Sequence, residues 1–160
     1  MDIILKEIVA IIKEETENIN KKIYGTTFLE ILKEKILNRQ DQIPLKNLKM
    51  QNSNAELEEN INVLEKNLFF KLSFYQNPKS ILKFKLDKNF LLIVFKEPVK
   101  IDILNQKTQK YINISLKPFM GVTLSKGTVC NLNFPKNSLI LQLETDDADF
   151  DIEKKTDATI

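Results

Sequence analysis

The side chains that could do chemistry in this chain of 160 residues are limited by one absence, because the sequence contains no histidine. Histidine is the base in Ser–His–Asp and Cys–His pairs, the usual proton shuttle near neutral pH, and a frequent zinc and iron ligand. The three glycines, Gly25, Gly121 and Gly127, are too scattered to form a glycine-rich phosphate loop. We therefore expect no catalytic residue, no metal site and no cofactor, which leaves a tyrosine- or lysine-based activity as the open alternative.

A lone cysteine and an acidic run are the next groups to consider. Cys130 alternates with Leu132 in an apolar pattern, and nothing near it in the sequence would lower the pKa of its thiol, so we interpret it as a small core residue. A single cysteine cannot form an internal disulfide, which suits a reducing cytoplasm. Residues 147–151 resemble the start of a calcium loop, but Ile152 replaces its glycine and Ala158 its bidentate glutamate. We interpret this run as part of a solvated tail.

Helical periodicity occupies the first third of the chain, and these elements must position any site. Apolar residues recur every three or four positions over residues 1–24, and Gly25 follows at a position suited to a helix C-cap. The capping-box pattern at residues 27–30 predicts a second helix, which should end near Asn38.

A further capping box at residues 53–56 predicts a third helix, after a connector that contains Pro44. Its apolar stripe would consist of Leu57, Ile61, Leu64 and Leu68.

From about residue 67 the apolar period changes from 3.6 to two, which is typical of half-buried strands. Seven or eight short runs of this kind follow, separated by turn-forming residues and with no helical pattern between them. This spacing predicts an antiparallel β-sandwich or barrel. We therefore expect an α+β fold in one compact domain, with about three N-terminal helices in residues 1–66, a β-barrel in 67–144, and an acidic, flexible tail in 145–160.

Charge is divided unevenly along the chain. Residues 67–143 hold 12 lysines against three acidic residues, a net charge of +9, whereas residues 144–160 hold seven acidic residues against two lysines, a net charge of −5. Either the β body binds an anionic partner, or lysine is simply its outward-facing strand residue and protects exposed sheet edges. Nucleic acid is the less favoured partner, because a single arginine, Arg39, cannot supply the usual bidentate base contacts. The acidic tail could also fold over the basic surface.

The sequence predicts a cytoplasmic protein without membrane contact. The longest uninterrupted apolar run covers residues 90–95, whereas a membrane-spanning helix needs about twenty apolar residues. The N-terminus also lacks the basic start and unbroken apolar stretch of a secretory signal.

Residues 114–143 resemble the second half of a cupin jelly roll. The stretch 116–122, Leu-Lys-Pro-Phe-Met-Gly-Val, is similar to the family's proline-and-glycine turn that leads into a strand. Residues 124–128 and 137–143 are similar to the closing strands of cupins related to sugar-nucleotide epimerases. The family spacing is Pro-x-Gly, whereas two residues separate the proline and the glycine here. The resemblance implies a metal-free, divergent cupin: a jelly-roll barrel of seven or eight strands with one open mouth, often dimeric and able to hold a small molecule.

Cupin metal ligands are chiefly histidines, and the epimerases use a catalytic histidine, so no catalytic residue carries over to this chain. The leading hypothesis is a non-catalytic domain that binds a small anionic ligand in the barrel mouth. Its candidate ligand-binding residues are Lys83, Lys85, Lys100 and Tyr111. The alternative is an oligomeric interaction protein, such as a homodimer, that buries the isoleucine stripe of its N-terminal helix against a partner. Weak non-specific nucleic-acid binding by the β body is a further alternative.

Overall fold

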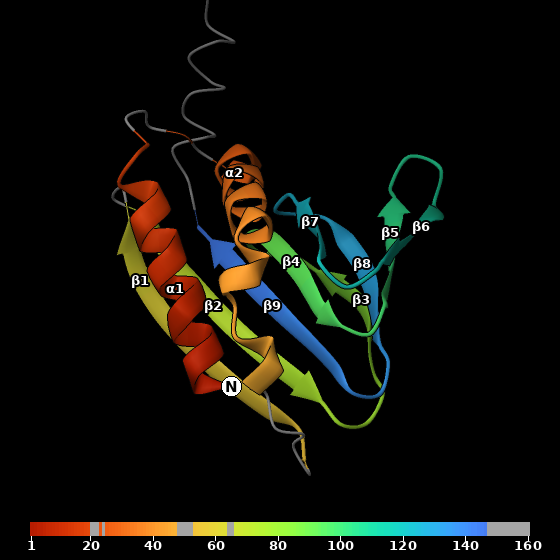
Figure 1. The fold of residues 1–160 in the computed structure, drawn as a ribbon. Helices are drawn as coiled ribbons and strands as arrows, with labels where there is room; N and C mark the ends of the chain where they lie inside the picture. Colours follow the sequence, from red (N-terminus) through yellow and green to blue (C-terminus); the bar gives the residue numbers. More distant parts are fainter. Residues whose placement is uncertain (20–22, 24, 48–52, 64–65, 147–160) are drawn as a thin grey trace, which may run out of the picture.

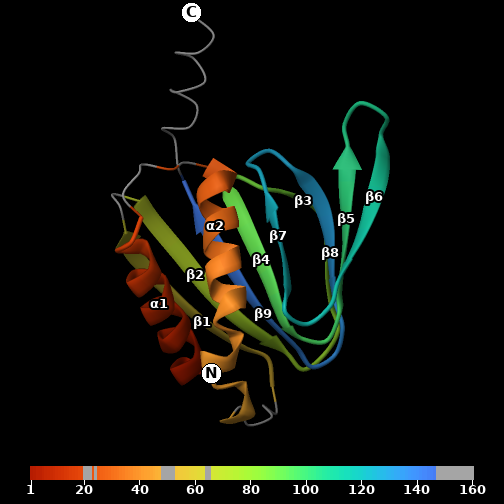
Figure 2. The same ribbon diagram turned by 45° about the horizontal axis from the view of Figure 1, so that its top comes forward.

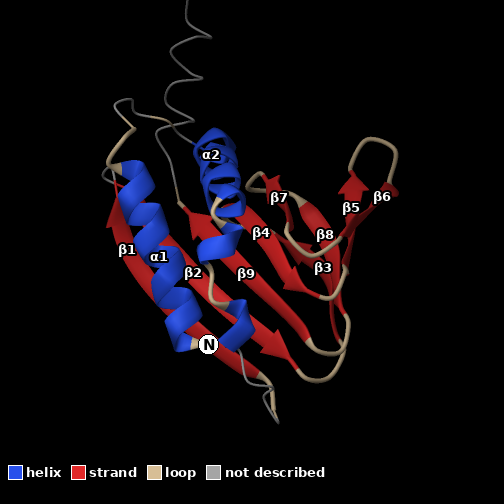
Figure 3. Ribbon diagram, in the orientation of Figure 1, coloured by secondary structure: helices blue, strands red, loops and turns tan. Residues whose placement is uncertain are grey.

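The computed structural model describes residues 1–19, 23, 25–47, 53–63 and 66–146, which form two α-helices, two short 3-10 helices and nine β-strands (Figure 3). The helices are α1 (Asp2–Thr16), α2 (Gly25–Asn38), η1 (Gln40–Gln42) and η2 (Leu45–Asn47). The strands are β1 (Ala55–Val63), β2 (Lys66–Tyr75), β3 (Lys79–Lys85), β4 (Asn89–Lys96), β5 (Val99–Asn105), β6 (Lys110–Leu116), β7 (Met120–Leu124), β8 (Val129–Phe134) and β9 (Ser138–Thr145). Within this part of the chain, no helix combines the length and the apolar composition needed to cross a membrane.

The strands form two facing antiparallel sheets (Figure 1). The strand order is β1-β2-β9-β4-β7 in the five-stranded sheet and β3-β8-β5-β6 in the four-stranded sheet. From β2 to β9 the chain changes sheet at every connection except the β5–β6 hairpin. Eight strands wound in this way form a jelly roll. The expected jelly-roll fold is therefore confirmed, with β1 added at one edge.

The third helix predicted after residues 53–56 is wrong, because residues 55–63 form strand β1. Leu57 and Ile61 are four residues apart, a spacing that fits one face of a helix and one face of a strand equally well. The neighbouring strand β2 decided between them, because β1 pairs with it along its whole length, from Ala55 opposite Phe74 to Val63 opposite Lys66. The described part of the chain therefore has two α-helices rather than three, and nine strands rather than seven or eight.

The first two predicted helices are confirmed, with different ends. The helix expected over residues 1–24 ends at Thr16 in the structure. The second helix begins at Gly25, where φ is 63°, so the capping-box residues lie inside the helix. Glu30 therefore does not cap a helix. It accepts a hydrogen bond from the hydroxyl of Thr123 on β7 and forms an ion pair with Lys33.

Both α-helices cover the outer face of the five-stranded sheet, as two views of the ribbon show (Figures 1 and 2). Alternate residues of β2, β4 and β9 point toward them and are buried. The apolar residues that the helices bury against this face are Ile4, Leu5, Ile8, Val9, Ile11 and Ile12 of α1 and Phe28, Leu29, Leu32 and Ile36 of α2. The isoleucine stripe of α1 therefore packs on its own chain, which corrects the hypothesis that it packs against a partner.

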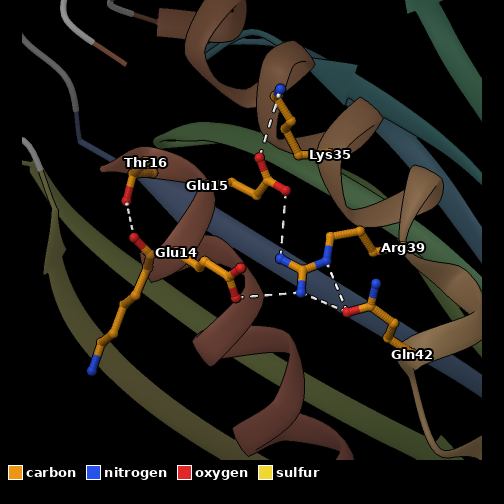
Figure 4. Close-up of polar contacts among 7 residues, drawn as sticks. Glu14, Glu15, Thr16, Lys35, Arg39 and Gln42 are labelled. Atoms are coloured by element: carbon orange, nitrogen blue, oxygen red, sulfur yellow. Dashed lines mark hydrogen bonds and ion pairs between the residues drawn. The ribbon is translucent and has the colours of Figure 1, made fainter. Parts of the chain in front are cut away.

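The only arginine of the sequence, Arg39, ties α1 to the end of α2 (Figure 4). Its Nη2 lies 3.3 Å from Oε2 of Glu14, and its Nη1 lies 3.4 Å from Oε1 of Glu15. The other carboxylate oxygen of Glu15 lies 3.7 Å from Nζ of Lys35, and Nε of Arg39 donates to Oε1 of Gln42 at 3.0 Å. Arg39 thus links α1 to the end of α2.

The acidic tail predicted from residue 145 lies outside the described residues from 147 onward, as does the acidic run 147–151. Thr145 belongs to β9 and is buried, so the ordered sheet reaches into the segment that was predicted to be flexible.

Candidate functional site

Two of the predicted ligand-binding residues, Lys100 and Tyr111, lie on the outer face of the four-stranded sheet. In β5, Val99 and Ile101 are fully buried between the sheets, so the exposed Lys100 between them points outward. Tyr111 of β6 lies opposite Leu104 in the β5–β6 register and is 40% exposed. The alternation of side chains places it on the same outer face as Lys100, but four residues farther along the register, roughly 13 Å away.

The other two predicted residues, Lys83 and Lys85, flank Phe84, which packs on the core between the sheets. They therefore also lie on the outer side of the sheet and are exposed. Lys83 lies at a β-bulge with φ of 52°, and its backbone amide donates to Oδ1 of Asn131 at 2.8 Å. The structure thus spreads the four predicted residues over β3, β5 and β6 and does not gather them around one point.

The space between the two sheets is largely filled by apolar side chains. The buried residues there are Tyr75, Leu86, Phe90, Leu92, Val94, Val99, Ile101, Leu116, Leu124, Cys130, Leu132, Phe134 and Ile140. Cys130 is fully buried among them, and this burial raises the pKa of its thiol, so its prediction as a core residue is confirmed. Two polar exceptions are Ser73 and Ser138, whose buried hydroxyls have no hydrogen-bond partner among the described residues.

Exposure rises along the inner face of the β5–β6 hairpin toward its tip. On β6, Leu116 is 2% exposed, Ile114 is half-buried and Ile112 is 55% exposed. Ile103, the partner of Ile112 on β5, is half-buried as well. The next residue on this inner face, Lys110, is exposed. The inner face of β6 is thus covered at Leu116 and exposed at Ile112, and we call the end of the jelly roll at the hairpin tip its open end.

The hairpin tip is fixed by its own hydrogen bonds. Oδ1 of Asn105 accepts from the amides of Lys107 at 3.0 Å and Thr108 at 3.3 Å. The carbonyl oxygen of Asn105 accepts from the amide of Gln109 at 2.8 Å. These bonds order the turn that precedes Lys110, the first residue of β6.

Backbone hydrogen bonds join the turn between β3 and β4 to the turn between β7 and β8. The amide of Gly127 donates to the carbonyl of Leu86 at 2.7 Å, and the amide of Leu86 donates to the carbonyl of Thr128 at 2.8 Å. The amide of Lys126 donates to Oδ1 of Asn89 at 3.1 Å. Gly127 has φ of 92°, a conformation that favours glycine.

Glu144 is the half-buried carboxylate nearest to these turns. Burial, and then the charge of Asp87, raise the pKa of Glu144, while the charges of Lys88 and Lys71 oppose the rise. Its neighbours do not form a metal site: among the described residues, no three carboxylate or cysteine side chains lie close enough together to hold a metal ion.

Replacing Glu144 by Gln is expected to raise the unfolding temperature at pH 7 by a few degrees. The raised pKa means that the folded protein binds the proton more tightly than the unfolded chain does. The stability that protonated Glu144 contributes is therefore complete below the pKa of this group in the unfolded chain. It is lost as the pH rises through the higher pKa of the group in the folded protein. Thermal unfolding from pH 4 to pH 8 checks this, and the advantage of the Gln variant should vanish at the acid end.

The matched control for this prediction is Glu7→Gln, at an exposed position of α1. A Glu144→Gln variant whose stability changes with pH in the same way as the Glu7→Gln variant would contradict the prediction.

Two surface cavities lie beside the helices that cover the five-stranded sheet. One, of about 510 Å³, lies between α2 and β7 and is lined by Thr26, Thr27, Glu30, Ile31, Glu34, Lys35, Asn38 and Thr123. Burial opposes ionisation of Glu30, but hydrogen bonds from Lys33 and Thr123 and the charge of Lys33 hold its pKa below the usual value. The other, of about 310 Å³, is lined by Lys13, Thr16, Glu17, Asn62 and Val63. The charge of Glu30 is compensated by Lys33 within the chain, so this carboxylate does not indicate a ligand in the larger cavity.

Sequence reasoning missed Lys110, the exposed Ile112 and the half-buried Ile103 and Ile114 of the hairpin. The alternation of Lys110, Ile112 and Ile114 along the sequence predicts that their side chains share one face of a strand. Tyr111, which lies between them in the sequence, is predicted on the other face. No signal in the sequence shows that this inner face becomes exposed toward the tip.

Comparison with known proteins shows a similarity of this chain to solved structures in fold only. No protein-family model matches the chain, and no curated protein matches it. A cupin superfamily protein from Desulfitobacterium hafniense is similar over 65% of this chain and 89% of its own, with 14% identity and a TM-score of 0.49. A recombinant oxalate oxidase in complex with glycolate matches 62% of this chain, with 11% identity and a TM-score of 0.47, and the match spans 53% of its own chain. KdgF from a Halomonas species matches 62% of this chain and 84% of its own, with 8% identity and a TM-score of 0.47.

Proposed function

We propose that this protein is a non-catalytic binding domain that takes a small molecule with an apolar body and an anionic head into the open end of its jelly roll. One observation carries the proposal. On the inner face of β6, burial decreases from Leu116 through Ile114 to Ile112, and the next side chain is Lys110. An apolar body in this place would cover the isoleucines, and its head would meet the lysine.

The apolar contact is the larger energetic term of the proposed site. Covering exposed apolar surface contributes about 25 cal/mol per Å², and ligand sites are typically concave and mostly apolar with a few polar groups that set orientation. A surface charge pair contributes roughly 0.2–1 kcal/mol. Lys110 would therefore orient the ligand, and Ile103 and Ile112 would supply most of the affinity.

This proposal keeps the anionic ligand that the sequence predicts. The residue that would meet its anionic head is now Lys110, in place of the four residues predicted from the sequence. Lys100 lies on the opposite face of the same hairpin, so it serves as a matched comparison for Lys110. Lys83 and Lys85 lie on β3, on the outer side of the sheet, and are not part of the proposed site.

Octanoate and octanol, which differ only in the head group, are the probes that test the proposal. We expect octanoate to raise the unfolding temperature and to bind in titration calorimetry more tightly than octanol. Lys110→Gln should weaken octanoate binding about two- to fivefold and leave octanol binding unchanged, whereas Lys100→Gln should change neither. Ile103→Ala should weaken both ligands about fivefold.

Two results would overturn the proposal. The first is the absence of any effect of either ligand on the unfolding temperature. The second is octanoate binding that depends on Lys100 and not on Lys110, which would move the site to the outer face.

A further inference from the structure

A group of polar side chains interrupts the apolar interior on the inner face of β2 and β9. Side chains alternate along each strand, and one set of leucines and phenylalanines packs under the helices. The other set points between the sheets and includes four neighbouring polar residues, which we call the β2–β9 polar cluster: Lys71, Ser73, Gln142 and Glu144. No residue of this cluster belongs to the ligand site proposed on the β5–β6 hairpin.

Two members of the cluster are buried without a polar partner. The hydroxyl of Ser73 is fully buried and forms no hydrogen bond with any described residue. Gln142 is 9% exposed, and its side-chain amide also forms no hydrogen bond within the described part of the chain. Buried polar groups of native proteins nearly always have a hydrogen-bond partner. These two side chains therefore indicate a polar partner from outside the chain.

Glu144 is the third member of the cluster without a partner. In the sheet register its half-buried side chain lies between Phe69 of β2 and Phe90 of β4, and its carboxylate forms no ion pair or hydrogen bond with the residues described by the structure. The charge of Lys71 is already answered elsewhere, because its Nζ lies 3.5 Å from Oε1 of Glu56. The carboxylate of Glu144 therefore remains open to a cation.

The cluster is accessible from the side of β1. In the row that crosses the sheet, Glu58 of β1 is exposed and Lys71 of β2 is half-buried. Gln142 of β9 follows at nine-tenths burial, and Leu92 of β4 is fully buried. Burial thus increases from the edge strand toward the centre of the sheet, so a small ligand would reach Gln142 and Glu144 over β1.

Charge around the cluster favours a cation as this ligand. The charged groups of the cluster and beside it give a net charge of −2, with Glu56, Glu58, Asp87 and Glu144 against Lys71 and Lys88. An anion would meet an excess of carboxylates, and a neutral ligand would supply no countercharge to Glu144. An ammonium group carries three hydrogen-bond donors and no acceptor, which suits the side-chain oxygens of Glu144 and Gln142.

We propose that the β2–β9 polar cluster binds the primary ammonium group of a small organic amine, which pairs with Glu144 and donates a hydrogen bond to the side-chain oxygen of Gln142. The two residues follow each other on one face of β9, with Cα atoms roughly 7 Å apart, so one ammonium group between them can contact both. Phe69, half-buried opposite Glu144, offers a ring to the cation.

Butylamine and 1-butanol, which differ in the charged head group, test the proposal at pH 8 and equal ionic strength. We expect butylamine to shift the side-chain amide resonances of Gln142 in heteronuclear NMR and to saturate in the millimolar range, whereas 1-butanol should leave them in place. The resonances that disappear in a Gln142→Leu variant identify this amide. That variant should also bind butylamine about three- to tenfold more weakly in titration calorimetry.

Two glutamates on opposite faces of the five-stranded sheet give a matched pair of variants. Glu144→Gln should weaken butylamine binding roughly tenfold or more, because it removes the charged acceptor. Glu59→Gln should not change it, since the half-buried Glu59 lies opposite Phe70, on the face that the helices cover. Thermal unfolding checks that both variants are folded.

Three results would overturn the proposal: no saturable shift of the Gln142 amide resonances up to about 100 mM butylamine, equal shifts with 1-butanol, or wild-type affinity in the Glu144→Gln variant. Ile103→Ala, on the β5–β6 hairpin, should leave butylamine binding unchanged. The amine site and the site proposed for octanoate can therefore fail separately.

Discussion

Deletion of residues 1–47 is expected to prevent the remaining chain from folding into a stable monomer. These residues contain α1 and α2, which cover the outer face of the five-stranded sheet. The sheet residues that belong to this covered core are Leu68, Phe70, Leu72, Phe74, Leu91, Ile93, Phe95, Leu139, Leu141 and Leu143. Each contributes about 1.5–3 kcal/mol through burial, and together they exceed the roughly 5–15 kcal/mol by which a native domain is stable.

The measurement compares the truncated and full-length chains by sedimentation and by far- and near-ultraviolet circular dichroism. We expect the truncated chain to aggregate, or to lose its near-ultraviolet signal while it binds a hydrophobic dye. Ile3→Ser is the control within α1, because Ile3 is 68% exposed and should be dispensable. A truncated chain that is monomeric and unfolds cooperatively would show that the helices are an accessory to an independent β-barrel.

Replacing Phe134 by Ala is expected to lower the free energy of unfolding by about 3–5 kcal/mol, and the unfolding temperature by about 10 °C. Phe134 is 2% exposed, and its ring stacks on that of Tyr75 with centroids 5.1 Å apart. On Tyr75, Nζ of Lys79 lies 5.0 Å from the ring centroid. The substitution would leave a void between the sheets, at the end opposite the β5–β6 hairpin tip.

Thermal and urea unfolding of three variants check this prediction. Phe134→Leu keeps most of the buried volume and should cost less than half as much as Phe134→Ala. Lys136→Ala, in the exposed turn two residues later, should be nearly neutral. A Phe134→Ala variant as stable as the Lys136→Ala variant would mean that this end of the jelly roll is not packed as the structure describes.

Local sequence patterns predicted most of the elements correctly. The period of 3.6 located α1 and α2, and the period of two located the strands of the jelly roll, because each records a face that must be buried locally. The pattern failed at residues 55–63, where Leu57 and Ile61 satisfy both periods. There the choice depended on β2, whose free edge could pair along the whole segment.

The sequence likewise predicts only part of the candidate site, and the tertiary structure determines the rest. Sequence alternation alone placed Tyr111 and Ile112 on opposite faces of a strand and would have been enough to place Lys110 on the face of Ile112, and the lack of histidine alone removed the ligands on which cupins usually depend. Only the tertiary structure decided which face points between the sheets, and that this face is buried at Leu116 but exposed at Ile112. The physical reason is that alternation is set by the geometry of one strand, whereas exposure is set by the distance to the opposite sheet, which depends on residues far away in the sequence.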